Sequence, residues 1–130
     1  MVPPENAKVT ETSTSIYWFD ENGILCAVAK KVAAPSLDET KRIMEEFKQM
    51  LGDRKACLLI DVTNSGESTR ESRDYAAIEF PKVVKAMALI SDSELGKMLA
   101  NLFFNLKQQP YPTKMFTGEN EAKEWLKQYL

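Results

Sequence analysis

Hydrophobic and polar positions along the chain switch repeatedly between the spacing of a β-strand and that of an α-helix. Residues 12–19 are rich in threonine, isoleucine and aromatic residues, which favours a strand. Asn22 and Gly23 follow, and because both tolerate a positive φ, the pair predicts a tight hairpin turn. Residues 24–32 are expected to form the return strand, so the chain begins with an antiparallel hairpin.

The first helical pattern begins at Ser36. Ser36 and Glu39, three residues later, form a capping box, and Gly52 predicts where the helix ends. The apolar residues between these limits recur at helical spacing, and they are Leu37, Ile43, Met44, Phe47, Met50 and Leu51.

The middle of the chain repeats the alternation of strand and helix. Residues 56–62 form a continuous apolar run, which predicts a central strand covered on both faces. The polar loop 63–69 leads to a second capping box with Ser68 as the cap, and Pro81 is expected to end that helix. Residues 83–90 predict the next strand.

The last third of the chain predicts two more helices around a short strand. A third capping box, with Ser91 as the cap, opens a helix whose apolar stripe comprises Leu95, Met98, Leu99, Leu102, Phe103 and Leu106. Residues 113–116 then form a strand after two prolines. A final helix carries Ala122, Trp125, Leu126 and Tyr129 on one face.

The order β-β-α-β-α-β-α-β-α predicts an α/β fold with a mixed, mostly parallel sheet, in which β-α units repeat after the N-terminal antiparallel hairpin. Residues 1–130 are expected to form a single domain, with residues 1–10 as a flexible lead-in. Right-handed crossovers between strands laid down in sequence order put the helices on one face of the sheet. The central strands are apolar on both faces, so a second subunit, a lipid-like ligand or further helices must cover the other side.

Composition excludes several classes of chemistry. The chain has no histidine, which removes Ser-His-Asp and Cys-His catalysis and imidazole metal ligation. Cys26 and Cys57 stand in apolar runs, where buried reduced thiols of a cytoplasmic protein are expected, and neither a metal nor a cofactor is predicted. Lys+Arg 17 and Asp+Glu 19 are dispersed, which argues against nucleic-acid binding. No apolar run approaches the roughly 20 residues of a membrane span.

The element pattern resembles the STAS domain, the fold of bacterial anti-sigma-factor antagonists (SpoIIAA-like), and in particular its small stand-alone members grouped with Sec14-type domains. The resemblance implies a non-enzymatic regulatory or interaction module that binds a protein partner or a second copy of itself. The Sec14-type relatives imply an alternative, a carrier or sensor of a small hydrophobic or lipid-like ligand. The segments that carry the resemblance are the turn at residues 21–24, the strand 58–62 with its loop and capped helix, and residues 85–90 and 116–126.

Phosphorylated members of that family carry a kinase-modified serine in an Asp-Ser-Ser-Gly-like motif at the start of the helix after the central strand. Counting forward from Asp61 places Glu71 at the phosphoacceptor position, with Ser72 beside it. A carboxylate has about half the charge of a phosphate, so the usual phospho-switch is not expected.

The polar loop after the central strand is the candidate regulatory and partner-binding site, because ligands of open parallel sheets bind outside the carboxyl ends of the strands. Free N–H groups at two helix N-termini would favour an anion there. The alternative is that the serines cap the helices and the remaining residues only form turns. The candidate residues are Asp61, Asn64, Ser65, Ser68, Thr69, Glu71, Ser72, Ser91 and Asp92.

A second candidate surface is apolar and comprises Phe103, Phe104 and Tyr111. Phe104 lies opposite the stripe of the predicted third helix, so either the segment around Tyr111 folds over it or it contacts a partner or a second subunit. A hydrophobic ligand would need a pocket of about 300 Å³ or more beside that helix. An enzyme is a third interpretation, with Cys57 and Asp61 as the central candidate groups.

Overall fold

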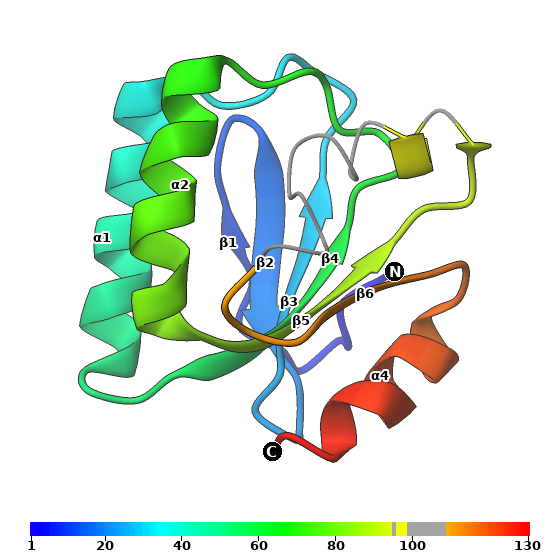
Figure 1. The fold of residues 1–130 in the computed structure, drawn as a ribbon. Coiled ribbons are helices and arrows are strands. Elements are labelled where there is room, and N and C mark those ends of the chain that lie inside the picture. Colours follow the sequence, from blue (N-terminus) through cyan, green and yellow to red (C-terminus); the bar gives the residue numbers. More distant parts are fainter. Residues whose placement is uncertain (95, 99–108) are drawn as a thin grey trace.

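The computed structural model describes residues 1–94, 96–98 and 109–130. The strands in these residues form one six-stranded sheet in the order β1-β2-β3-β4-β5-β6 (Figure 1). Antiparallel pairing joins β1 (Thr10–Glu11), β2 (Ser15–Phe19) and β3 (Leu25–Ala29), and parallel pairing continues through β4 (Ala56–Asp61), β5 (Val84–Ile90) and β6 (Thr113–Phe116). The predicted mixed, mostly parallel sheet with an N-terminal antiparallel hairpin is confirmed.

The turn between β2 and β3 is organised by Asp20. Its Oδ1 accepts hydrogen bonds from the backbone N–H groups of Asn22 and Ile24, each at 2.9 Å. Gly23 has φ 82, a conformation that glycine adopts without steric cost. The predicted Asn22-Gly23 turn is therefore confirmed, and a buried carboxylate that the pattern did not reveal holds it.

The helix α1 (Leu37–Leu51) begins and ends where its capping residues predict. Ser36 Oγ accepts the N–H of Glu39 at 3.2 Å, and Gly52, at φ 60, donates its N–H to the carbonyl oxygen of Lys48. Met44, Phe47 and Leu51 are its buried residues. Glycine at this position closes the last turn of the helix.

The helix α2 (Arg70–Val83) differs from its prediction at both ends. Its cap is Thr69 rather than Ser68, since Thr69 Oγ1 accepts the N–H of Ser72 at 3.2 Å. Pro81 lies inside the last turn and does not end the helix. Proline removes only one helical hydrogen bond there, and the N–H of Val84 still donates to the Phe80 carbonyl as β5 begins.

The segment predicted as the first strand contains a turn. Thr12 Oγ1 accepts the N–H groups of Thr14 and Ser15, at 3.3 and 3.0 Å. Hydroxyl side chains stabilise turns in this way, so only Ser15–Phe19 is strand, and Thr10–Glu11 adds an edge strand that the pattern did not predict. Met1, within the expected lead-in, packs against the second core cluster of the sheet.

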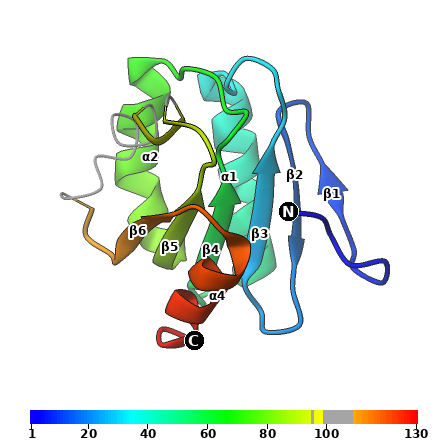
Figure 2. The same cartoon turned by 90° about the vertical axis from the view of Figure 1, so that its right-hand side faces the viewer.

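Helices cover both faces of the sheet (Figure 2). On one face, side chains of α1 and α2 pack on a core that includes Leu25, Leu58 and Leu89. On the other, α4 (Glu119–Lys127) buries Ala122 and Leu126 against a second core, to which Met1 and Ala7 also contribute. Of the covers expected for this second face, a helix is the one found. Because α4 follows the last strand, it is no crossover, and the handedness rule does not restrict its side.

The predicted third helix falls mostly outside the described residues, as do Leu95, Leu99, Leu102, Phe103, Phe104 and Leu106. At its start the cap is Ser93 rather than Ser91, because Ser93 Oγ accepts the N–H of Gly96 at 2.9 Å. Met98, expected on the apolar stripe, is 55% exposed. In the described part of the chain, no helix has the length and apolar character to cross a membrane.

Candidate functional site

A cavity of about 400 Å³ lies between the sheet, α1 and α2, and Gly96, in the segment after β5, also lines it. Its lining includes Ala29 at the end of β3 and Val62 directly after β4, so it reaches the carboxyl ends of the parallel strands. Open parallel sheets bind ligands at this edge. We name this space the helix-side cavity.

Most of the wall of the helix-side cavity is apolar. The apolar lining residues come from β3, α1, β4 and α2, and they include Ala27, Ile43, Met44, Phe47, Ile60, Ala76 and Phe80. The cavity exists because small side chains line it. The residues from β3 and α2 include alanines, whereas leucine or valine at these positions would fill the space. An apolar ligand would gain packing contacts with this wall.

Polar residues gather at one end of the cavity. They belong to the start of β2, the first turns of α1 and α2 and the loop after β4, and they are Ser15, Thr40, Ser65, Glu67, Ser68, Ser72 and Arg73. We name these seven residues the polar rim. The helices begin at this end of the sheet, so the cavity combines an apolar interior with a rim of hydroxyl and charged groups.

Gly66 lets two loops meet beside the cavity. A Cβ atom at this position would lie 3.0 Å from the carbonyl oxygen of Val32 and 3.1 Å from the backbone nitrogen of Ala34. Both contacts involve backbone atoms, which cannot turn away as a side chain can. Gly66 and Ala34 both line the cavity, so this close approach shapes its wall.

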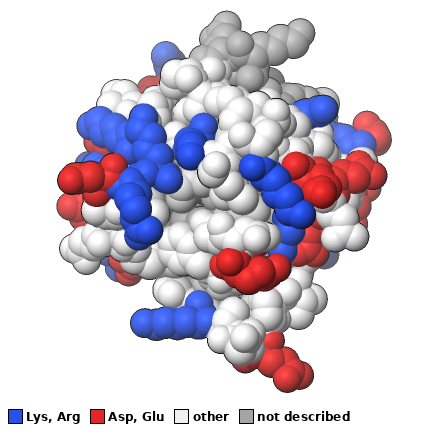
Figure 3. Space-filling view, turned by 90° about the horizontal axis from the view of Figure 1, so that it is seen from below, with Lys and Arg blue, Asp and Glu red and all other residues white. Residues whose placement is uncertain are grey.

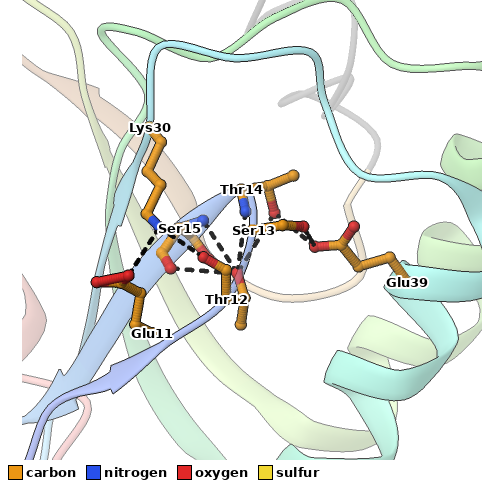
Figure 4. A network of polar contacts seen from close by, with 7 residues as sticks. All are labelled: Glu11, Thr12, Ser13, Thr14, Ser15, Lys30 and Glu39. Carbon is orange, nitrogen blue, oxygen red and sulfur yellow. Dashed lines mark hydrogen bonds and ion pairs between the residues drawn. The ribbon is translucent and has the colours of Figure 1, made fainter.

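The turn between β1 and β2 is tied to the first turn of α1 (Figure 4). Ser13 Oγ and Thr14 Oγ1 donate hydrogen bonds to Glu39 Oε1, at 2.6 and 3.1 Å. On the other side of the turn, Lys30 Nζ donates to the carbonyl oxygen of Thr12 at 2.7 Å. The residues that follow Thr14 and Glu39 belong to the polar rim, so the network holds that part of the rim in place.

The predicted site loop falls partly on the cavity. Ser65, Ser68 and Ser72 belong to the polar rim, whereas Asn64, Thr69 and the remaining candidates do not line the cavity. Sequence reasoning missed the apolar wall altogether. The signal that points to it is the alanine at every helix-facing position of β3 after Leu25.

Asp61 and Asp92 are engaged in contacts between loops. Asp61 Oδ1 accepts the N–H of Thr63 at 3.0 Å, and its Oδ2 lies 3.6 Å from the amino nitrogen of Met1. The N–H of Asp92 donates to Thr63 Oγ1 at 3.4 Å. The loops after β4 and β5 therefore lie side by side.

The candidate hydroxyl groups differ in access. Ser72 is 3% exposed, and its Oγ accepts a hydrogen bond from Thr69 Oγ1 at 3.0 Å. Ser91 is fully buried, and its Oγ donates to the carbonyl oxygen of Ser93. Glu71, at the position of the family's phosphoacceptor, is exposed in the first turn of α2.

The apolar candidates contribute no exposed surface that the structure describes. Tyr111 is 7% exposed in the core on the α1 and α2 face, and burial raises the pKa of its hydroxyl to about 12. Phe103 and Phe104 lie outside the described residues.

The two thiols lie in the second core, away from the cavity. Burial, with the nearby Asp20 carboxylate, raises the pKa of Cys26 to about 12, and burial also raises the pKa of Cys57. A protonated thiol is a poor nucleophile. Within the described residues, no group of three or more acidic or cysteine side chains is placed to hold a metal ion.

A second hollow, of about 350 Å³, lies between β1 and α1 and is lined by Thr10, Tyr17, Glu46, Gln49 and Met50. Tyr17 donates its hydroxyl to Glu46 Oε2 at 2.5 Å. Burial and this carboxylate together raise the pKa of Tyr17 to about 12. The two polar groups satisfy each other, so we place the candidate site at the helix-side cavity.

Charges of both signs occur at the opposite end of the molecule, where the parallel strands begin (Figure 3). Lysine and arginine side chains gather there in small groups, and most of these groups lie near acidic side chains. On the face shown, no continuous basic stripe of the kind that follows a nucleic-acid backbone is visible.

Comparisons with known proteins place the chain in a family. A family model described as "Domain of unknown function (DUF7793)" matches residues 17–130. The chain belongs to this family. A comparison with curated proteins finds no match for this DUF7793 domain.

Two solved structures are similar to the DUF7793 domain. One is the crystal structure of an uncharacterized protein from the DUF3478 family with a SpoIIAA-like fold, from Shewanella loihica PV-4, at 18% identity and TM-score 0.58 over 92% of this chain and 91% of that one. The other, a protein of unknown function from Arthrobacter sp. FB24, has 28% identity and TM-score 0.33 over 85% of this chain and 97% of that one. The first likeness confirms the SpoIIAA-like fold that the sequence resembles, and the second carries no structural argument.

Proposed function

We propose that this chain is a non-enzymatic binding domain that carries or senses a small hydrophobic ligand in the helix-side cavity. The observation that carries the proposal is the cavity itself, about 400 Å³ in volume and mostly apolar in its wall. Ligand pockets in proteins range from about 300 to 1,000 Å³ and combine apolar walls with a few polar groups. Its volume is above the minimum of about 300 Å³ that a pocket for a hydrophobic ligand needs.

A binding role also agrees with the chemistry of the described side chains. The cysteines are buried with raised pKa values, and the Asp61 carboxylate is occupied by Thr63. Regulation by phosphorylation forms no part of the proposal, because Ser72 is buried. We extend the proposal to a cytoplasmic location, where free buried cysteines stay reduced.

The test compares two alanines of α2 in the purified full chain, with 1-decanol as the probe. Ala76 lines the cavity and is 6% exposed, whereas Ala77 is exposed. Ala76→Leu fills the cavity, and Ala77→Leu is the matched control. We expect calorimetric titration to give a decanol affinity about ten-fold weaker, or ~1.4 kcal/mol, for Ala76→Leu than for wild type. Ala77→Leu should bind as wild type does.

Native mass spectrometry of the purified wild-type chain adds a second reading, since a retained ligand would appear as added mass that A76L lacks. Equal decanol binding by wild type and A76L, or no binding by wild type, would overturn the proposal.

Association with a protein partner or with a second copy is a second proposal, in line with the interaction role that the family resemblance implies. The observation that favours it is Ile78, which is 66% exposed on α2. The fully buried centre of an interface is more apolar than the rest of a protein surface. Light scattering of wild type and Ile78→Ser tests self-association, for which a dimer that I78S abolishes is expected. Monomers of both proteins would contradict it.

A further inference from the structure

The helix-side cavity changes from polar to apolar along both helices that line it. On α2, Ser72 and Arg73 in the first turn precede Ala76 and Phe80. On α1, Thr40 precedes Ile43, Met44 and Phe47, which also line the cavity. Both helices start at the same end of the sheet (Figure 1). The polar end of the cavity therefore receives contributions from two helices at once, and an amphiphilic molecule matches both ends.

Arg73 is the basic side chain of the polar rim. One of its guanidinium nitrogens donates to the carbonyl oxygen of Ser68 at 2.8 Å, and a guanidinium has five N–H donors. Arg70, three residues earlier, is a useful contrast. Its side chain is 87% exposed, it does not line the cavity, and it pairs with Asp74. Arg73 is thus held by the loop after β4 with donors to spare.

Ser72 adds a buried hydroxyl to the same end. Its Oγ accepts a hydrogen bond from Thr69 Oγ1, so the hydrogen of Ser72 itself remains to be donated. Ser72 is 3% exposed and lines the cavity. Buried donors in proteins nearly always have an acceptor, and a ligand oxygen between Ser72 and Arg73 would supply one.

The charge balance of the polar rim limits the head group. The negative charge of Glu67 balances the positive charge of Arg73, so the rim residues together carry no net charge. The N-termini of α1 and α2 add partial positive charge. This balance accommodates one negative charge, whereas a phosphate, at about −1.5 to −2, would meet stronger repulsion from Glu67. A planar carboxylate also matches the fork of a guanidinium.

We propose that the ligand is a monocarboxylate amphiphile whose apolar chain occupies the helix-side cavity and whose carboxylate binds Arg73 and Ser72. This inference rests on the proposed function, and it adds the class of ligand and the residues that select it. Arg73 and Ser72 determine specificity for the head group. The apolar wall binds the chain of the ligand and contributes the same affinity whatever the head group is.

The test compares three probes with the same decyl chain, namely decanoate, 1-decanol and decyl phosphate, by titration calorimetry on the full chain at pH 8 and low salt. We expect decanoate to bind about ten-fold more tightly than 1-decanol, a difference of ~1.4 kcal/mol, and decyl phosphate to bind more weakly than decanoate. Arg73→Gln should abolish the preference for decanoate over decanol. Arg70→Gln, the matched control on the same helix turn, should keep it.

The outcomes separate this inference from the proposed function. If decanoate and decanol bind equally well to wild type, the head-group assignment fails while a hydrophobic ligand remains supported. If no probe binds, the proposed function fails. Tighter binding of decyl phosphate than of decanoate overturns the choice of a carboxylate. Should R73Q not fold, the comparison of the three probes on wild type decides by itself.

Discussion

Lys123 Nζ on α4 lies 3.5 Å from Oδ2 of Asp20, a side chain that is 1% exposed. The other oxygen of the same carboxylate holds the β2–β3 turn through two backbone N–H groups. Oδ2 has no hydrogen-bond partner among the described residues, so Lys123 is its counter-charge. One buried acid thus links the N-terminal hairpin to the helix that covers the second face of the sheet.

Asp20→Ala is expected to lower the free energy of unfolding by about 2–4 kcal/mol, because it removes two hydrogen bonds and leaves Lys123 without its buried partner. Urea unfolding measures this loss. Glu119→Gln is the matched control, since Glu119 Oε1 lies 3.3 Å from the same lysine but is 37% exposed. The control should cost less than about 1 kcal/mol, and an equal loss in both variants would contradict the role given to Asp20.

Gly66→Ala is expected to destabilise the domain and to weaken decanol binding. The new Cβ would press on the backbone of Val32 and Ala34, and overpacking of this kind costs about 1–3 kcal/mol. Gly118→Ala is the control, because a Cβ there meets no atom within 4 Å. Thermal unfolding and decanol titration of both variants test the expectation, which fails if the two substitutions have the same effect.

The pairing of α1 with α2 predicts a pH dependence of stability. Glu79 on α2 contacts Lys48 of α1 at 2.9 Å and Lys82 at 3.1 Å. Hydrogen bonds from Lys48 and then Lys82 lower the pKa of Glu79 below its ordinary 4.5. The hydrogen bond to Glu79 raises the pKa of Lys48 above 10.5.

A carboxylate with a lowered pKa stabilises the folded state above its unfolded pKa and loses that effect as the pH falls through the folded value. Lys48 acts in the opposite sense, so its share persists below 10.5 and is lost at higher pH. We expect wild type to exceed Glu79→Gln in stability by a constant amount near neutral pH. The difference should shrink as the pH drops below about 5. Urea unfolding at several pH values measures it, and a difference that grows in acid would refute this assignment.

The cysteines are expected to resist alkylation in the native protein. With a pKa of about 12, Cys26 at pH 8 is thiolate in on the order of 1 molecule in 10,000. Iodoacetamide labelling followed by mass spectrometry should detect modification of Cys26 and Cys57 only after denaturation. Rapid labelling of either residue in the folded chain would show that the second core opens more readily than the packing of α4 indicates.

Local signals allowed most elements to be predicted. Ser36, Gly23 and Gly52 each favour a cap or a turn through contacts with nearby residues. A short stretch of sequence is therefore enough to predict their effect. The errors at Pro81 and at residues 12–14 have a common cause. A proline in a last turn and hydroxyl residues next to a strand each fit two local structures, and tertiary packing decides between them.

The site was harder to foresee because a cavity is a property of packing across elements. Ala27 and Ala76 are inconspicuous in their own segments, and only the folding of the helices over the sheet makes them walls of one cavity. Position after a parallel strand is a topological signal, and Ser65 and Ser68 of the predicted loop do line the cavity. These serines gained a chemical meaning only when the apolar wall beside them was known.

The packing of α4 on the second face of the sheet has a practical consequence. A polypeptide shortened before Glu119 would keep every strand yet leave Cys57, Leu59 and Ala88 facing water, since Ala122 and Leu126 pack in the same core as they do. The truncated sheet would expose an apolar surface and would tend to aggregate.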